Sequence, residues 1–107
     1  MRLDPPPARH ERPAIDEAAL TAARLADLML AGTRARGSDR WALFLEPVPE
    51  LLRDATILEL RVVARRARAA YGAKDSIREA LPAELTEPFL DALDRLLKAL
   101  AKDALSR

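Results

Sequence analysis

Residues 56–72, TILELRVVARRARAAYG, decide the fold class of this 107-residue chain. Thr56 and Glu59 have the spacing of a capping box, in which the threonine oxygen accepts one free backbone N–H and the glutamate reaches back to another. Gly72 is placed to end the helix as a left-handed residue. The stretch therefore predicts one helix with a defined start and a defined end.

This predicted helix carries two apolar stripes. The first follows 3,4,3,4 spacing and consists of Ile57, Leu60, Ala64, Ala67 and Tyr71. The second, about 120° or more away, consists of Leu58, Val62 and Ala69. Because a helix with two apolar stripes must be covered from two sides, we expect it to form the centre of a bundle or of a dimer.

The rest of the chain also favours helices. Its 107 residues suit one domain, half of them are hydrophobic, and only three are glycine. No long run of β-branched residues alternates with period two, as a half-buried strand would. The composition predicts an all-α fold, a small helical bundle of about four main helices, in a single domain over residues 14–107 with a core of Leu and Ala.

Before this domain, residues 1–13 hold four of the eight prolines and predict an extended Pro-rich arm. From Ala14 the periodicity becomes helical, with Gly32 or Gly37 as the stop. Ser38 then begins a short helix that ends before the prolines at 47 and 49. One more turn over residues 49–54 would direct Leu51 and Leu52 inward.

Two further helices are expected downstream. Ser76 and Glu79 repeat the capping-box spacing and start a short helix that Pro82 ends. Thr86 is the expected cap of the last helix, with Pro88 in its first turn, where a missing N–H costs little. This closing helix is amphipathic.

Catalytic and metal-binding groups are scarce. The chain has no cysteine, and its single histidine, His10, lies in the arm without a nucleophile or ligand partner. We therefore expect no catalytic residue, no metal, no cofactor and no enzymatic activity. No segment approaches the roughly 20 apolar residues of a membrane span, so we expect a cytoplasmic protein without a membrane partner. Fifteen Arg against three Lys, with neither Asn nor Gln, suggest a GC-rich bacterial genome.

Two local resemblances fail at the same proline. The string Asp75-Ser76-Ile77 looks like the phosphopantetheine attachment site of acyl carrier proteins, and two helices around Gly72 look like a helix-turn-helix. In both cases Pro82 ends the second helix too early. Ser76 is therefore predicted to act only as a helix cap.

An arginine cluster offers a nucleic-acid alternative. The candidate phosphate contacts are Arg61, Arg65, Arg66 and Arg68. The following segment, residues 73–94, has a net charge of −4. The stronger expectation is that these arginines pair with its acids within the fold or across a dimer, or are simply solvated. Nucleic acid is therefore the second choice among partners.

The preferred function is a protein-interaction or regulatory module that self-associates, as a homodimer or larger, or binds another protein. Its candidate partner-binding residues are Leu58, Val62, Leu20, Leu28, Trp41 and Phe44. Trp41 and Phe44 would serve this purpose only if their short helix stood away from the bundle, since a Trp with aliphatic neighbours is a usual energetic centre of an interface.

Overall fold

The computed structural model describes residues 7–105, and within them every regular element is a helix. The α-helices are α1 (Pro13–Ala35), α2 (Asp39–Leu45), α3 (Val48–Asp54), α4 (Ile57–Arg68) and α5 (Ala83–Leu105). Three 3-10 turns accompany them: η1 (Arg9–Glu11), η2 (Ala69–Tyr71) and η3 (Ile77–Glu79). The predicted all-α bundle is confirmed.

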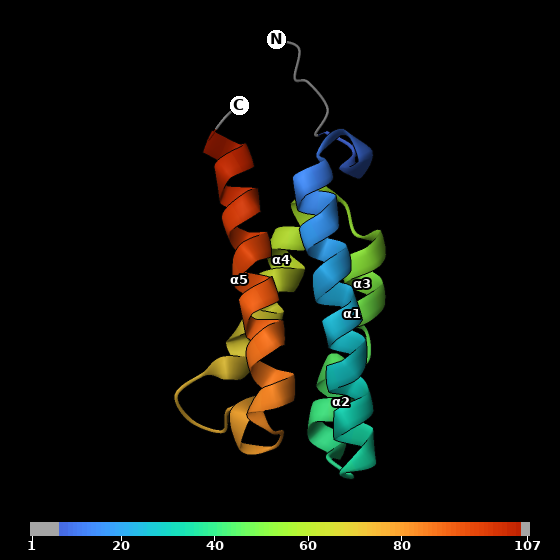
Figure 1. Cartoon of the computed structure of the whole chain (residues 1–107), viewed down its shortest axis with the longest axis vertical. Coiled ribbons are helices and arrows are strands. Elements are labelled where there is room, and N and C mark those ends of the chain that lie inside the picture. Colours follow the sequence, from blue (N-terminus) through green and yellow to red (C-terminus); the bar gives the residue numbers. More distant parts are fainter. Residues whose placement is uncertain (1–6, 106–107) are drawn as a thin grey trace.

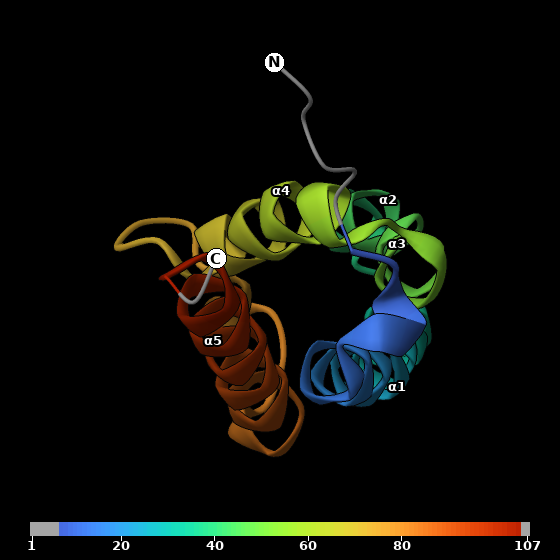
Figure 2. The ribbon, with the colours of Figure 1, turned by 90° about the horizontal axis from the view of Figure 1, so that it is seen from above.

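The two long helices, α1 and α5, run antiparallel and side by side (Figure 1). α2 and α3 pack along α1, and α4 crosses from α3 to α5 on the side away from the contact between α1 and α5 (Figure 2). α1 thus contacts α5, α3 and α2. The main contacts of α4 with other α-helices are those with α3 and α5. The central helix of the bundle is α1.

Small side chains let α1 lie close to its neighbours. Ala19, Ala22, Ala23 and Ala26 are completely buried, and large side chains from the other helices fill the space around them. Among residues 7–105 the largest completely buried side chain is that of Phe89 on α5. The core is built from Leu and Ala, as the composition predicts.

Gly37 ends α1. It has a φ of +67°, its N–H donates to the Arg34 carbonyl, and the Ser38 N–H donates to the Thr33 carbonyl. This is a Schellman motif, which needs a residue in the left-handed region after the helix. Of the two stops considered, Gly37 is right, and Gly32 lies inside the helix where α5 approaches it.

The capping box at the start of α4 is confirmed. The Glu59 N–H donates to Thr56 Oγ1 at 3.2 Å, and the Thr56 N–H donates to Glu59 Oε2 at 3.4 Å. The predicted end is wrong, because Gly72 has a φ of −61° and is extended. The helix instead tightens into the η2 turn after Arg68, which directs Tyr71 into the core.

Only one of the two stripes of α4 is covered. The first stripe, from Ile57 to Tyr71, is buried throughout, whereas Leu58 and Val62 of the second stripe are 62% and 67% exposed. The expectation that this helix is the centre of the bundle is wrong, because its neighbours in the chain pack on one side only.

The last helix begins earlier than predicted. α5 starts at Ala83, and the N–H groups of Leu85 and Thr86 both donate to the Pro82 carbonyl. Thr86 is therefore buried within the helix instead of capping it, and Pro88 lies inside the helix. The Ser76 segment is the three-residue turn η3, in which Ser76 Oγ accepts from the Arg78 N–H.

The described end of the arm, residues 7–12, packs on the bundle, and the rest of the predicted arm, residues 1–6, lies outside the described residues. Where the sequence predicted an extended arm, Arg9–Glu11 form a 3-10 turn. Arg9 Nε lies 2.8 Å from Asp16 Oδ1, and Arg12 Nε lies 2.6 Å from Asp103 Oδ1. These ion pairs connect this part of the arm to both long helices.

Candidate interaction surface

An apolar groove runs between the α2–α3 segment and α4. It encloses about 250 Å³. Leu43, Pro47 and Leu51 line one side of it, and Val62, Val63 and Arg66 line the other. Phe44, Val48 and Ala67 complete the lining. Arg66 is the single charged residue among the lining residues.

Local spacing explains how the groove arises. Leu43, Pro47 and Leu51 follow one another at intervals of four residues, so the two short helices present them along one side. Leu58 and Val62 stand four residues apart on α4 and form a ridge beside the groove, here called the α4 ridge. The groove and the α4 ridge therefore lie next to each other on one face.

The hydrophobic side chains of this face are unusually accessible. Leu43 is 72% exposed and Leu51 is 43% exposed, in addition to the two residues of the α4 ridge. Four of the seven large hydrophobic residues that are exposed in the described part of the chain thus belong to this face. The expectation that Leu51 and Leu52 both point inward is wrong for Leu51, since only Leu52 is completely buried.

Charged residues are exposed on both helical segments that border the groove. Those of the α2–α3 segment include Glu46, Glu50 and Asp54, and those of α4 include Glu59, Arg65 and Arg66. Arg66 lines the groove, whereas Arg65 lines a different hollow, between α4 and α5. Within residues 7–105 neither of these two arginines has an ion pair, whereas Glu50 pairs with Arg53.

The four candidate phosphate contacts do not act as one cluster. Arg68 Nε lies 2.8 Å from Asp94 Oδ1, which confirms pairing with the acidic segment, and Arg61 Nη2 donates to the Leu100 carbonyl at 3.4 Å. Arg65 and Arg66 remain for external contacts. A second, open hollow between α4 and α5 is lined by Arg61, Arg65, Leu97, Lys98, Ala101, Ala104 and Leu105.

Trp41 belongs to the core. Its indole and the Phe44 ring pack edge-on, with ring centroids 5.6 Å apart, and the Arg40 guanidinium lies over the indole, 4.8 Å from its centroid. α2 packs directly on α1, so the condition under which Trp41 would dock a partner is not met. Phe44 is half-buried and lines the groove, so it remains part of the candidate surface.

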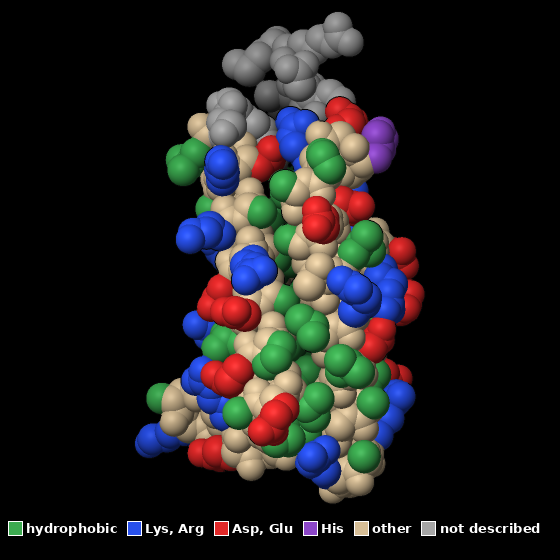
Figure 3. All heavy atoms as spheres, viewed as in Figure 1, with side chains coloured by type: hydrophobic (Ala, Val, Ile, Leu, Met, Phe, Trp, Pro, Cys, Tyr) green, Lys and Arg blue, Asp and Glu red, His purple; other side chains and the backbone are tan. Residues whose placement is uncertain are grey.

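Leu20 and Leu28 are exposed, at 42% and 55%, but both lie on α1, which does not line the groove. The structure therefore separates them from Leu58 and Val62. On the face formed by α1 and α5, hydrophobic side chains gather along the lower part of the seam between the two helices (Figure 3). This is a second, separate apolar area.

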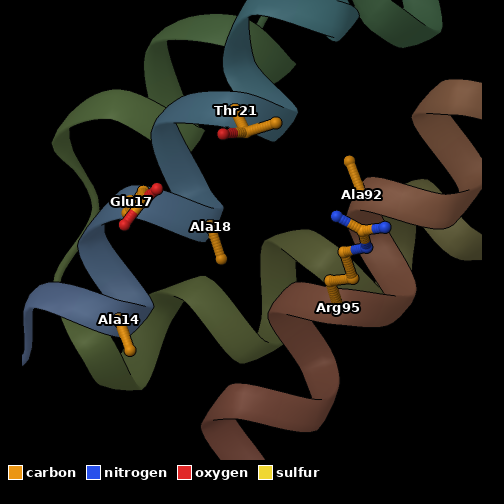
Figure 4. Close-up of a pocket in the computed structure, with 6 residues that line it drawn as sticks. All are labelled: Ala14, Glu17, Ala18, Thr21, Ala92 and Arg95. Atoms are coloured by element: carbon orange, nitrogen blue, oxygen red, sulfur yellow. The ribbon is translucent and has the colours of Figure 1, made fainter.

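A shallower hollow of about 230 Å³ lies higher on the same seam. Arg95 extends into it from α5, and α1 contributes Glu17 and Thr21 (Figure 4). Three alanines form the remainder of its lining: Ala14, Ala18 and Ala92.

Ser76 is buried, and its oxygen accepts a backbone N–H, as expected of a cap. Close to it, a group of polar contacts that sequence reasoning missed joins η2, η3 and α5. The Tyr71 hydroxyl donates to the Thr86 carbonyl at 2.6 Å, and Arg78 Nη2 lies 2.7 Å from Glu87 Oε1. Arg78 also lies over the Tyr71 ring. These contacts hold the connection between α4 and α5 in place.

Among residues 7–105, no group of three or more His, Asp or Glu side chains could hold a metal ion. The helices in that range are also too short or too polar to cross a membrane. Comparison with protein-family models, with curated proteins and with solved structures found no match to this chain. The geometry of the groove and its edges is therefore the basis for a functional proposal.

Proposed function

We propose that this chain is a small, non-enzymatic protein-interaction module that binds its partner through the face formed by α2, α3 and α4. One observation carries the proposal: three large hydrophobic side chains, each more than 40% exposed, line a single groove, and a fourth, Leu58, stands four residues before Val62 on α4. Scattered surface leucines are ordinary, but a contiguous apolar area bordered by charges is typical of an interface.

The energetic reason is the burial of apolar surface. Full burial of a Leu or Val side chain is worth about 1.5–3 kcal/mol, so a partner that covers Leu43, Leu51, Leu58 and Val62 gains several such contributions. Arg66 in the wall of the groove adds selectivity and speed to the encounter, because exposed charges mainly steer partners and reject wrong ones.

Site-specific photo-cross-linking tests this function. A photoreactive residue placed at Val62 in the full chain should form covalent adducts with protein in a cell extract, and the same residue at Arg24 should not. Arg24 is an exposed position on α1, away from the groove, and is the matched control. Equal labelling at both positions, or no adduct at Val62, would contradict the proposal.

A nucleic-acid function is the second candidate, favoured by the unpaired Arg65 and Arg66 and by the hollow that Arg61, Arg65 and Lys98 line. It requires binding that weakens steeply with salt, because each phosphate contact releases counterions. A DNA or RNA probe should then shift at low salt, and the Arg65→Ala, Arg66→Ala double variant should lose most of the shift. No shift at low salt would eliminate this candidate.

A further inference from the structure

We propose that the open hollow between α4 and α5 is a second contact surface, which binds an acidic amphipathic helix of a partner protein. The hollow has a volume of about 580 Å³. It lies between α4 and α5, whereas the groove of the proposed function lies between α4 and the α2–α3 segment, and the two share no lining residue. Neither surface therefore depends on the other.

Every charged side chain that lines the hollow is a cation. Arg61 and Arg65 stand one helical turn apart on α4, and Lys98 belongs to α5. Like charges at this helical spacing repel each other, so an anion bound beside them removes an unfavourable interaction. Within residues 7–105 neither Arg65 nor Lys98 has an ion pair, and Arg61 donates to an uncharged acceptor, the Leu100 carbonyl. The hollow is thus complementary in charge to an acidic ligand.

The acids of α4 and of the second half of α5 are engaged elsewhere. Asp94 pairs with Arg68 at 2.8 Å, and Asp103 pairs with Arg12 at 2.6 Å. The Glu59 carboxylate belongs to the capping box at the start of α4. None of these three acids lines the hollow, so its positive charge remains for a ligand.

The rest of the lining is apolar. Leu97, Ala101, Ala104 and Leu105 provide it from about two turns of α5. Leu97 is only partly buried, and Leu105 is 87% exposed. A ligand that only neutralised the cations would leave this apolar strip in water, so a ligand with both acidic and apolar side chains is the better complement. An amphipathic helix with Leu beside Asp or Glu presents both kinds of side chain on one face.

Nucleic acid is a weaker complement to the same hollow. No aromatic side chain lines it for bases to stack on, and the whole chain has neither Asn nor Gln to read adenine. Four of the seven lining residues are apolar, and a phosphate backbone would not bury them. The lining therefore favours an acidic segment of protein.

Selection from a display library tests the inference. Phage that display random peptides of about 16 residues, some four helical turns, are selected on the purified full chain. Counter-selection on the Arg65→Ala, Lys98→Ala double variant then removes peptides that bind elsewhere. Both positions are exposed, and circular dichroism verifies that the double variant is folded. We expect the surviving peptides to be acidic, with Leu, Ile or Val at intervals of three and four residues.

Fluorescence polarisation of the labelled peptides then measures their Kd at about 0.1 M salt. The double variant should raise the Kd by at least about tenfold, because it removes two cations from the hollow. Arg24→Ala with Arg34→Ala is the matched control, since it removes the same charge from exposed positions on α1. Ala101→Trp should also abolish binding, because its indole fills the hollow. Val62→Asp, in the wall of the other groove, should not change the Kd.

Four results would overturn the inference. One is that no peptide survives the counter-selection, and another is that Ala101→Trp binds the surviving peptides as tightly as wild type. A third is a DNA or RNA oligonucleotide that binds the hollow more tightly than every selected peptide at about 0.15 M salt. The fourth is a dimer of the purified chain that the double variant dissociates, which would make a second copy the occupant. Failure of the cross-linking test at Val62 would contradict the proposed function and leave this inference standing.

Discussion

Arg9 Nη1 donates to the carbonyl oxygen of Leu52 at 2.7 Å, across 43 positions of the chain. The same nitrogen donates to the Ala55 carbonyl at 3.1 Å, and Arg9 Nε pairs with Asp16. A cation here satisfies carbonyls at the end of α3, where the helix dipole is negative. One residue of the arm thus joins α1 to α3.

Replacing Arg9 by Ala should therefore destabilise the whole bundle. We expect a loss of about 1.5–3 kcal/mol in the free energy of unfolding, because a charged donor is removed from part-buried carbonyls. Urea denaturation followed by circular dichroism measures this loss. Arg24→Ala is the control, since Arg24 is exposed and makes only a long contact to Thr21. Equal stability of Arg9→Ala and wild type would mean that the arm contact contributes nothing in solution.

Tyr71→Phe tests the hydrogen bond to the Thr86 carbonyl. Its loss should cost about 1 kcal/mol of unfolding free energy. Burial, followed by the nearby Glu87 charge, raises the pKa of Tyr71 well above its ordinary value of 10.0. Above pH 10 the unfolded chain therefore loses the phenolic proton first, and stability falls as pH rises.

In the Tyr71→Phe variant this alkaline decline should be shallower, because Phe has no proton to lose. Chemical denaturation at pH 9, 10 and 11 makes the comparison with wild type. Parallel pH profiles for the two proteins would show that Tyr71 is accessible to water when the chain is folded.

Glu87→Gln should change the acid side of the stability profile. The hydrogen bond from Arg78, followed by that from the Thr86 hydroxyl, lowers the pKa of Glu87 below its ordinary 4.5. Its contribution is therefore present above pH 4.5 and is lost as pH falls through the lower folded-state pKa. The variant should show a flatter profile between pH 6 and 3 than the control Glu84→Gln, at an exposed position of α5. Indistinguishable profiles would argue that the Arg78 pair does not persist in solution.

The two stripes of α4 should respond differently to truncation. Leu60 is completely buried, so Leu60→Ala should cost about 2–5 kcal/mol through lost burial and the cavity left behind. Leu58, two residues earlier, is 62% exposed, and Leu58→Ala should change monomer stability by less than about 0.5 kcal/mol. Denaturation at a low protein concentration makes this comparison. A large effect of Leu58→Ala under those conditions would mean that the outer stripe is covered within one chain.

Local chemistry made several features predictable. The capping box of Thr56 and Glu59 and the left-handed Gly37 involve only neighbouring residues, so the sequence already contains both partners of each contact. The burial of Ile57 and Leu60 follows from helical periodicity, and the Leu and Ala composition defines the core. None of these features requires knowledge of where another helix lies.

Contacts between distant segments were not predictable in this way. Gly72 could have ended α4, but burial of Tyr71 and its bond to Thr86 favoured a 3-10 turn. The groove exists because α3 lies beside α4. This packing leaves Leu51 on the surface and buries Leu52.

By itself, then, the sequence determined the helical fold, the caps and the apolar stripes, because each depends on residues at most a few positions apart. Only the tertiary structure decided that the outer stripe of α4 is uncovered and that, within residues 7–105, Arg68 pairs with Asp94 whereas Arg65 and Arg66 form no ion pair. The physical reason is that exposure and ion pairing depend on which helices become neighbours. That choice is made by the packing of the whole core.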